Sequence, residues 1–304
     1  MQERTFENLI FDGKDLFLEG AITIKGSFEM NGSKLIVSGN LTILGDDGVE
    51  IENGDIIVSG DLIIRPNINI KGVNISCDYL YCCDVNISDG DIWTNTNLFA
   101  SNITSDGKDL FLEGYITIEG SLEMNGAKFI VSRDLTILGG DGVEIENGDI
   151  IVSGDLTIEK NINIKGVNIS CNCLQCSDIN ISDGDIWTNT DLLASTSNIT
   201  SDGNIEVKCN SNVADITCLN YLITGDNYSD SINASQDIYI LGDNESCDLT
   251  AREILIDGNC YTNGYPITAQ EIVIDGDCIS EGGSITAHHF VCTGELSCKG
   301  LSIG

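Results

Sequence analysis

The chain is poor in positively charged residues. Its 304 residues include 14 Lys and Arg against 48 Asp and Glu, which gives a formal net charge of −34. A surface of that sign repels nucleic-acid phosphates and anionic membrane surfaces, and it attracts cations. We therefore expect no nucleic-acid partner. The 41% of hydrophobic residues and their regular alternation argue against a disordered acidic chain.

The sequence also lacks long apolar runs. None approaches the length of about 18 residues that a transmembrane helix needs. The N-terminal residues MQERTFENLIFDGKDLF do not combine a basic segment with an apolar core, as a secretory signal peptide does. We therefore expect no transmembrane segment and a cytoplasmic location, with export to the surface by a non-classical route as the alternative.

Proline, histidine and aromatic residues are scarce as well. Two Pro against 33 Gly suit many tight turns between short strands. The two histidines, His288 and His289, are adjacent, and residues 12–201 contain none. Carboxylates are so frequent that no pair stands out for acid–base chemistry. The sequence therefore predicts a protein that is not an enzyme, although a polysaccharide-acting enzyme on a β-helix stays an alternative.

A short repeat dominates what is present. The segments LTAREILIDG (249–258), ITAQEIVIDG (267–276) and ITAHHFVCTG (285–294) follow one another at 267 − 249 = 18 and 285 − 267 = 18 residues. Apolar residues alternate within each segment, and a period of two predicts a strand with one buried face. Pieces of about six residues, repeating every 18, predict the coils of a three-sided β-solenoid.

A larger duplication precedes these coils. Residues 12–101 and 106–195 differ at 18 of 90 aligned positions, with an offset of 106 − 12 = 94. A solenoid tolerates such copying because each coil contacts only its neighbours. We predict a single elongated all-β solenoid with a cap at 1–11, a first copy at 12–105, a second copy at 106–201 and divergent coils at 202–304. Segment 202–248 is the least regular part.

Thirteen cysteines are the first candidate site. Cys171, Cys173 and Cys176 resemble a thiolate metal nest, but structural zinc usually takes four ligands. Cys82 and Cys176 also fall on the inward, apolar track, and free Cys commonly packs as a small hydrophobe. We predict core packing, with metal binding and disulfides as the alternatives.

Acidic turns are the second candidate. Asp89, Asp91, Asp183 and Asp185 belong to two copies of an Asp-Gly-Asp turn, and stacked carboxylates suit Ca²⁺, which takes six to eight oxygen ligands. The alternative is turn chemistry, because Asp-Gly forms turns readily. These four residues are the candidate Ca²⁺ ligands, and no other metal or cofactor is expected.

Two tryptophans are the third candidate. Trp93 and Trp187 occupy equivalent places in the two copies, each within ISDGDIWTNT. A paired patch that binds sugar or protein would use both rings, whereas a packed turn would bury them. We favour the packed turn.

The C-terminal residues ELSCKGLSIG carry the main functional hint. Leu296, Cys298, Leu301 and Ile303 continue the inward pattern to the end of the sequence. Terminal repeats of solenoids are normally polar, because an exposed edge invites another strand. We therefore expect these four residues to mediate assembly with a second copy.

The coils ITAQEIVIDG and ITAHHFVCTG, followed by ELSCKG, resemble those of bactofilins, the bacterial polymer-forming cytoskeletal proteins. The likeness is best over 249–303. It implies a right-handed three-sided β-helix and polymerisation without nucleotide.

Taken with the resemblance, the sequence predicts a non-enzymatic structural or scaffold protein that assembles end to end with itself. The first alternative is a surface-exposed binding rod, similar to an adhesin or passenger domain, that uses its acidic turns and Trp93 and Trp187 to contact a carbohydrate or protein.

Overall fold

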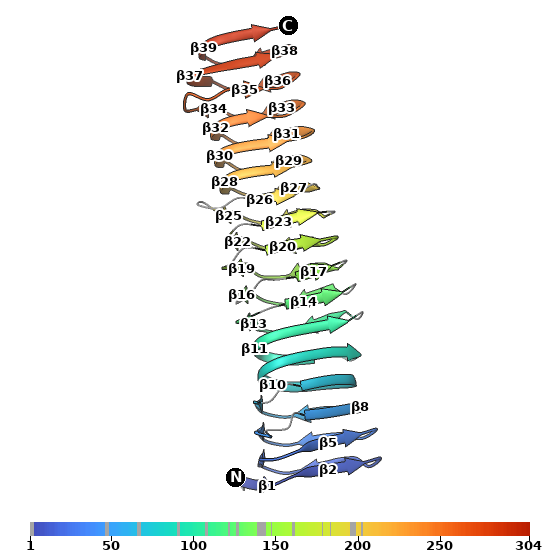
Figure 1. Ribbon diagram of the computed structural model, residues 1–304. Helices are drawn as coiled ribbons and strands as arrows, with labels where there is room; N and C mark the ends of the chain where they lie inside the picture. Colours follow the sequence, from blue (N-terminus) through green and yellow to red (C-terminus); the bar gives the residue numbers. More distant parts are fainter. Residues whose placement is uncertain are drawn as a thin grey trace. The chain divides into compact units, whose positions relative to one another are not determined.

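The computed structural model describes residues 3–45, 49–65, 68–89, 92–106, 109–120, 122–125, 128–138, 144–146, 148–159, 162–177, 179–182, 184–194, 199–201 and 203–304. Within these ranges the regular structure is all β-strand. They hold no helix that could cross a membrane. The chain divides into unit 1, Met1–Lys160, and unit 2, Asn161–Gly304. In each unit the strands stack in parallel, rung upon rung (Figure 1).

Unit 1 contains three parallel ladders, which the chain visits in turn. The first contains β1 (Glu3–Phe6), β4 (Ala21–Ile24), β7 (Leu41–Ile43), β9 (Leu62–Ile64), β13 (Tyr115–Ile118), β16 (Leu135–Ile137) and β19 (Leu156–Ile158). The second contains β2 (Leu9–Asp12), β5 (Phe28–Asn31), β14 (Leu122–Asn125) and β17 (Glu144–Glu146). The third contains β3 (Leu16–Leu18), β6 (Lys34–Val37), β12 (Leu110–Leu112), β15 (Lys128–Val131) and β18 (Asp149–Val152). Three long strands, β8 (Val49–Val58), β10 (Ile68–Asp89) and β11 (Ile92–Asp106), run around corners and join several ladders.

Unit 2 repeats this plan. Its first ladder contains β22 (Leu174–Cys176), β25 (Leu192–Ala194) and β34 (Cys260–Thr262), and its second contains β20 (Ile162–Lys165), β23 (Ile179–Ser182), β26 (Ile199–Ser201) and β35 (Ile267–Thr268). Both continue through β28 (Ser211–Cys218), β30 (Asn227–Ala234), β32 (Asn244–Thr250), β37 (Cys278–Ala287) and β39 (Leu296–Ile303). The third contains β21 (Asn168–Cys171), β24 (Ile186–Thr188), β27 (Asn204–Val207), β29 (Asn220–Ile223), β31 (Asp237–Ile240), β33 (Glu253–Ile256), β36 (Glu271–Ile274) and β38 (His289–Cys292).

The predicted all-β solenoid with three strands per coil is therefore confirmed in each unit. Register partners on the third ladder are separated by as few as 221 − 205 = 16 residues, between Ile205 and Tyr221, and by as many as 56 − 35 = 21, between Leu35 and Ile56. The mean agrees with the predicted coil of about 18 residues. The predicted cap at 1–11 includes strands β1 and β2, which pair with the next coil. The handedness of the coil stays a prediction.

The core of each unit lies inside the coil. Alternate residues of the strands in the middle coils are fully buried, among them Leu35, Ile56, Ile254 and Ile272, while their neighbours face outward. Burial of apolar surface contributes roughly 25 cal/mol per Å². The alternation of apolar residues in the sequence thus correctly predicts which face of these strands is buried.

One corner of unit 2 is built from stacked Gly-Asx pairs. The backbone amide of Asp243 donates to Asp226 Oδ1 (2.9 Å), that of Asn259 to Asp243 Oδ1 (2.7 Å), and that of Asp277 to Asn259 Oδ1 (3.0 Å). Each side chain therefore binds the rung above it. The glycine that precedes each Asx residue leaves space for the backbone of the rung below.

Candidate functional site

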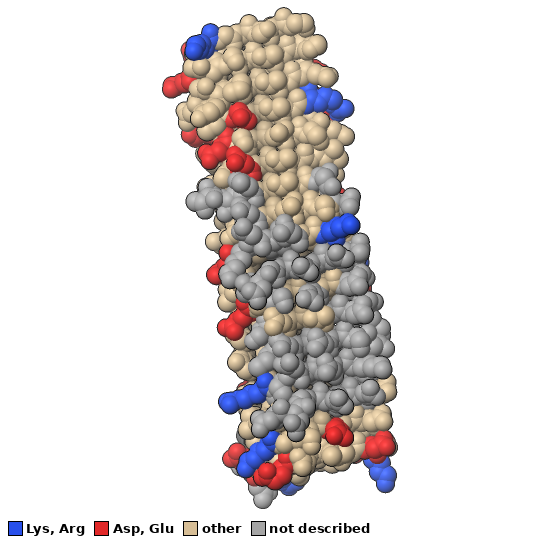
Figure 2. All heavy atoms as spheres, viewed as in Figure 1, with Lys and Arg blue, Asp and Glu red and all other residues tan. Residues whose placement is uncertain are grey.

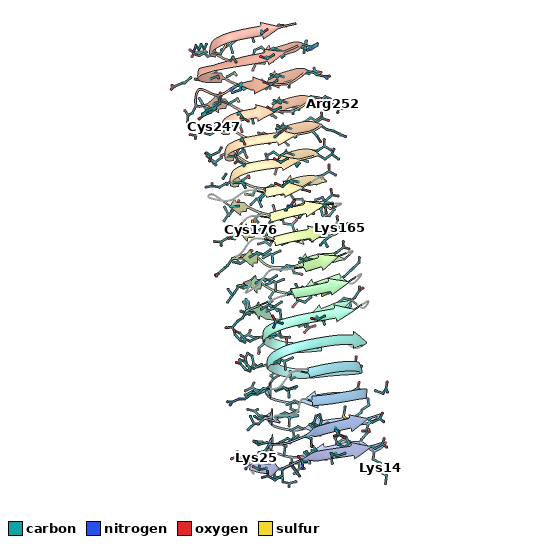
Figure 3. The ribbon with its side chains drawn as sticks, viewed as in Figure 1. Lys14, Lys25, Lys165, Cys176, Cys247 and Arg252 are labelled. Atoms are coloured by element: carbon teal, nitrogen blue, oxygen red, sulfur yellow. The ribbon has the colours of Figure 1, made fainter. Side chains whose placement is uncertain are left out.

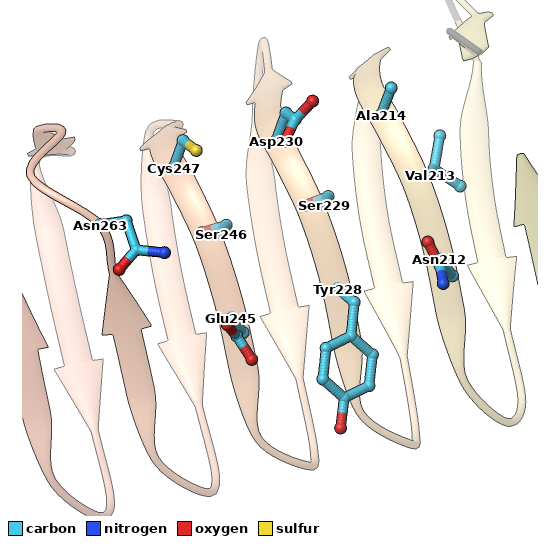
Figure 4. Close-up of a pocket in the computed structure, with 10 residues that line it drawn as sticks. All are labelled: Asn212, Val213, Ala214, Tyr228, Ser229, Asp230, Glu245, Ser246, Cys247 and Asn263. Atoms are coloured by element: carbon cyan, nitrogen blue, oxygen red, sulfur yellow. The ribbon is translucent and has the colours of Figure 1, made fainter. Parts of the chain in front are cut away.

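A depression lies on unit 2, along the corner where β28, β30 and β32 bend from the first ladder to the second. It encloses about 260 Å³, and its lining includes outward residues of these strands and the residue after β34 (Figure 4). We call it the corner groove. Its polar and aromatic side chains include Asn212, Tyr228, Asp230, Glu245, Cys247 and Asn263.

The sequence places these side chains by the strand register. Asn212, Tyr228 and Glu245 share one outward register position on successive rungs, and Tyr228 is 45% exposed. Asp230 and Cys247 occupy the bend itself (Figure 4). The groove thus combines one aromatic face with carboxylate, amide and thiol groups.

Carboxylates crowd the second-ladder side of the bend. Asp215 and Asp248 flank Ser231 in register, and Ser231 Oγ donates to Asp215 Oδ1 (2.7 Å). Burial, and then the charge of Asp215, raise the pKa of Asp248. Burial, and then Asp230 and Asp248, raise the pKa of the Cys247 thiol. A thiol in such a field stays protonated at neutral pH, so it is a poor nucleophile, and the groove favours hydrogen-bond donors and cations.

Acidic residues gather elsewhere on unit 2 as well. Over its strands in the upper part of Figure 2, several Asp and Glu side chains lie toward the left edge, beside a broad uncharged surface. In the described part of the chain, no three His, Cys, Asp or Glu side chains are grouped so that they could hold a metal ion.

Of the four predicted Ca²⁺ ligands, the structure describes the side chain of one, Asp185. The placements of Asp91 and Asp183, and the side chain of Asp89, lie outside the described residues. Asp185 is described, and its Oδ1 accepts a hydrogen bond from the backbone amide of Asn204 on the next rung. Its carboxylate therefore has the same role as the Asx residues of the other corner, which is turn chemistry between rungs.

Of the two tryptophans, the structure describes the side chain of Trp187. Trp187 is 37% exposed on the outer face of β24, where it lies in register between Ser170 and Glu206. The side chain of Trp93 lies outside the described residues. Trp187 is thus an exposed strand residue rather than part of a buried turn, which corrects the interpretation that we favoured for it.

The two histidines lie on the outside of the third ladder. Both are exposed, and His289 Nδ1 lies 3.4 Å from Glu271 Oε1 on the rung below. A surface ion pair of this kind contributes little to stability.

The cysteines that the structure describes are largely core residues. Cys77, Cys82, Cys171, Cys218, Cys260 and Cys278 are buried. Burial raises the pKa of Cys77 and of Cys218 to about 12. Cys173 and Cys176 are half-buried, and Cys176 lies on a first-ladder strand, on the same side of unit 2 as Cys247 in Figure 3. Core packing thus accounts for the buried set.

We expect the rate of alkylation to distinguish the buried thiols from the half-buried ones. Cys77 and Cys218 should react with iodoacetamide more than about a hundredfold more slowly than Cys298, because burial removes both access and thiolate. Peptide mass spectrometry of the native protein, with a urea-unfolded sample as control, measures this. Equal labelling of the three residues in the native protein would show that the core assignment is wrong.

The predicted assembly residues lie together on β39, the last strand that the structure describes. Leu296, Leu301 and Ile303 are 41%, 42% and 56% exposed, and Cys298 is half-buried. They are in register with the inward-facing, buried residues Cys278, Ile285, Ala287 and Ser280 of β37. Among the described strands, β39 pairs with β37 alone. The inward pattern therefore continues to β39, but its side chains face solvent.

Sequence reasoning missed the interior polar column of unit 2. Asn227 and Asn244 are fully buried at inward positions where alternation predicts apolar residues, and Asn227 Nδ2 donates to Asn244 Oδ1 (2.9 Å). The irregularity of segment 202–248 was the available signal.

Comparison of the chain with protein-family models, with curated proteins and with solved structures gives no match. The fold and the surfaces described above therefore carry the functional argument.

Proposed function

We propose that this protein is a structural element that assembles end to end with copies of itself, through the edge of β39. The observation that carries the proposal is the exposed inward track of Leu296, Cys298, Leu301 and Ile303. A strand edge with unpaired backbone groups and apolar side chains is a template for another strand. The coil pattern that resembles bactofilins supports the same idea, because those proteins polymerise.

The first coil of unit 1 presents strands on the two ladders that β39 occupies. The last described coil of unit 2 presents β38 on the third ladder and β39 on the first and second. The first coil of unit 1 presents β1, β2 and β3 on the first, second and third ladders. Strands β1 and β2 of a second copy could therefore pair with β39 along the first and second ladders, which would leave one third-ladder position between β38 and that copy's β3.

The spacing of the inward residues also matches. Leu301 follows Leu296 by 301 − 296 = 5 residues, and Leu9 follows Arg4, a charged and exposed residue at an inward position of β1, by 9 − 4 = 5. The pairs Cys298–Ile303 and Phe6–Phe11 have the same separation of five. Phe6, Leu9 and Phe11 are each half-buried, so they have apolar surface left to cover. A contact of this type is heterologous, and it produces an open filament unless its rotation closes a ring.

The charge at β39 does not oppose the contact. Residues 295–304 contain one acidic and one basic residue, Glu295 and Lys299, whereas the whole chain has 48 acidic against 14 basic. Repulsion between copies therefore arises mainly from other surfaces. Salt at 0.1 M screens this repulsion beyond about 10 Å.

The proposal predicts that Ile303→Lys abolishes end-to-end assembly into filaments. A buried lysine at the junction would lack a partner, whereas Ser302→Lys on the same strand points outward and should leave assembly intact. Negative-stain electron microscopy and light scattering, with and without Ca²⁺, measure filament length. Filaments of the Ile303→Lys variant, or a wild-type protein that stays monomeric at high concentration, would contradict the proposal.

A mixing experiment tests the polarity of the contact. Phe11→Lys changes the first coil of unit 1, so this variant alone should also fail to form filaments. Mixed with Ile303→Lys, it retains one intact pair of coils and should produce end-to-end pairs, which neither variant forms alone, but no filaments. Circular dichroism of both variants confirms that they remain folded.

A further inference from the structure

The third ladder of unit 1 carries two equivalent apolar patches on its outer face. The first patch consists of Phe17, Ile36 and Ile57, which follow one another in register. The second consists of Phe111, Ile130 and Ile151, in the same arrangement. Phe17 is 67% exposed and Phe111 43%. Exposed apolar side chains that repeat in register, rather than singly, indicate an interaction surface.

A column of charges flanks each patch. Asp15, Lys34 and Asp55 lie beside the first patch, with Lys34 Nζ 2.8 Å from Asp55 Oδ2 and the Lys34 amide donating to Asp15 Oδ1 (3.0 Å). Asp109, Lys128 and Asp149 repeat this column beside the second patch, with Lys128 Nζ 3.4 Å from Asp149 Oδ2. Each patch therefore has an apolar column and an alternating acidic–basic–acidic column, side by side.

We propose that these two patches pair the outer face of the third ladder with the same face of a second, antiparallel copy of this chain. The face is a sheet surface, and two such surfaces pack at about 10 Å with interdigitating side chains. The occupant is the same face of another copy, because that face offers an equally flat apolar column and the complementary charges.

Symmetry sets the orientation. Consider a two-fold axis that lies between the two faces and runs along the strands, perpendicular to the direction in which the rungs stack. Rotation about it makes the stacking directions of the two copies antiparallel. It also places the apolar column of one copy opposite the apolar column of the other, and the charged column opposite the charged column. Apolar side chains then meet apolar side chains, and the first patch of one copy meets the second patch of the other. A parallel arrangement would instead place the apolar column against the charged one.

Charge complementarity selects the offset. Opposed without a shift, Lys34 would face Lys128 of the mate and Asp15 would face Asp149. A shift of one rung, roughly 4.8 Å, places each lysine opposite a carboxylate and each phenylalanine opposite an isoleucine. This complementarity counters the general repulsion that a net charge of −34 imposes between copies.

The inference goes beyond end-to-end assembly and is tested separately from it. In the Ile303→Lys background, where the proposed end contact is blocked, sedimentation equilibrium should show a reversible dimer. The double change Phe17→Asp with Phe111→Asp should raise the dimer dissociation constant by at least roughly a hundredfold, because exposed aromatic residues are typical binding hot spots. A monomeric Ile303→Lys parent at all concentrations would overturn the inference, whatever the wild-type protein does at its ends.

A matched control is available on the first ladder. Thr23 and Thr117 are also equivalent positions of the two copies, and both face outward and are half-buried. Thr23→Asp with Thr117→Asp adds the same charge and should leave the dimer unchanged. If this control and the phenylalanine variant weaken the dimer equally, general repulsion accounts for the result and the inference fails.

Mixing the two single variants tests the orientation. In the antiparallel pair, a mixture of Phe17→Asp and Phe111→Asp proteins contains one contact between two unchanged patches, so it should dimerise more tightly than either variant alone. If the mixture gains nothing, the antiparallel arrangement is wrong.

Discussion

Replacing Gly258 by alanine is expected to lower the free energy of unfolding of the C-terminal coils by about 3 kcal/mol, near the upper end for overpacking. A Cβ atom at this position would lie 2.4 Å from the carbonyl oxygen of Gly242 and 2.6 Å from its carbonyl carbon. These are backbone atoms of the rung below, so they cannot rotate away as a side chain would. The methyl group must therefore separate two rungs.

The rungs next to Gly258 are expected to increase the loss of stability. Gly276 stacks on Gly258 in the same way, since a Cβ atom at Gly276 would lie 2.4 Å from the Gly258 carbonyl oxygen, so a displaced residue 258 disturbs the rung above as well. The amide of Asn259 would also move away from Asp243 Oδ1, which it reaches at 2.7 Å. One methyl group thus acts on three successive rungs.

Gly300→Ala is the matched control. A Cβ atom there meets nothing within 4 Å, so this change should shift stability by less than about 0.5 kcal/mol. Urea unfolding gives the free energies, and hydrogen exchange of the amides of β33 and β36 locates the loss, since repeat proteins lose stability locally. If Gly258→Ala and Gly300→Ala lowered stability equally, the close approach of Gly258 to the backbone of Gly242 would not be what excludes a side chain at this corner.

The solenoid itself could be predicted from the sequence because its determinants are local. In ITAQEIVIDG, Ile267, Ile272 and Ile274 alternate with residues that face outward, and all three are buried. The coil length follows from the distance between similar segments. Neither inference needs knowledge of contacts between residues that are distant in the sequence.

Features that depend on the stacking of rungs could not be predicted in the same way. The corner groove brings Asn212, Tyr228 and Glu245 together only because their strands are in register. The hydrogen bond from Asn259 to Asp243 likewise joins two rungs. The acidic turns were therefore interpreted as candidate Ca²⁺ ligands, whereas Asp185 binds the backbone amide of Asn204.

Replacing Asn244 by alanine is expected to have the other large effect, a loss of about 3 kcal/mol that combines a cavity with unpaired polar groups. Asn244 is fully buried, and its Nδ2 donates to Ser246 Oγ (2.9 Å). Its Oδ1 accepts from Asn227 Nδ2 (2.9 Å), and Asn227 Oδ1 accepts in turn from Tyr221 Oη (3.0 Å). Tyr221 is fully buried too, and burial raises its pKa.

The exposed residue Asn233 provides the control, because it faces outward from β30 and Asn233→Ala should change stability by less than about 0.5 kcal/mol. A double-mutant cycle separates the hydrogen bond from the cavity. Asn227→Ala with Asn244→Ala should cost less than the sum of the single changes, by about 1 to 2 kcal/mol, because each single change leaves the other amide unpaired. Strict additivity would mean that the two amides are not coupled. In that case the polar column would be a set of independent buried groups, and it would not help to hold the rungs of unit 2 in register.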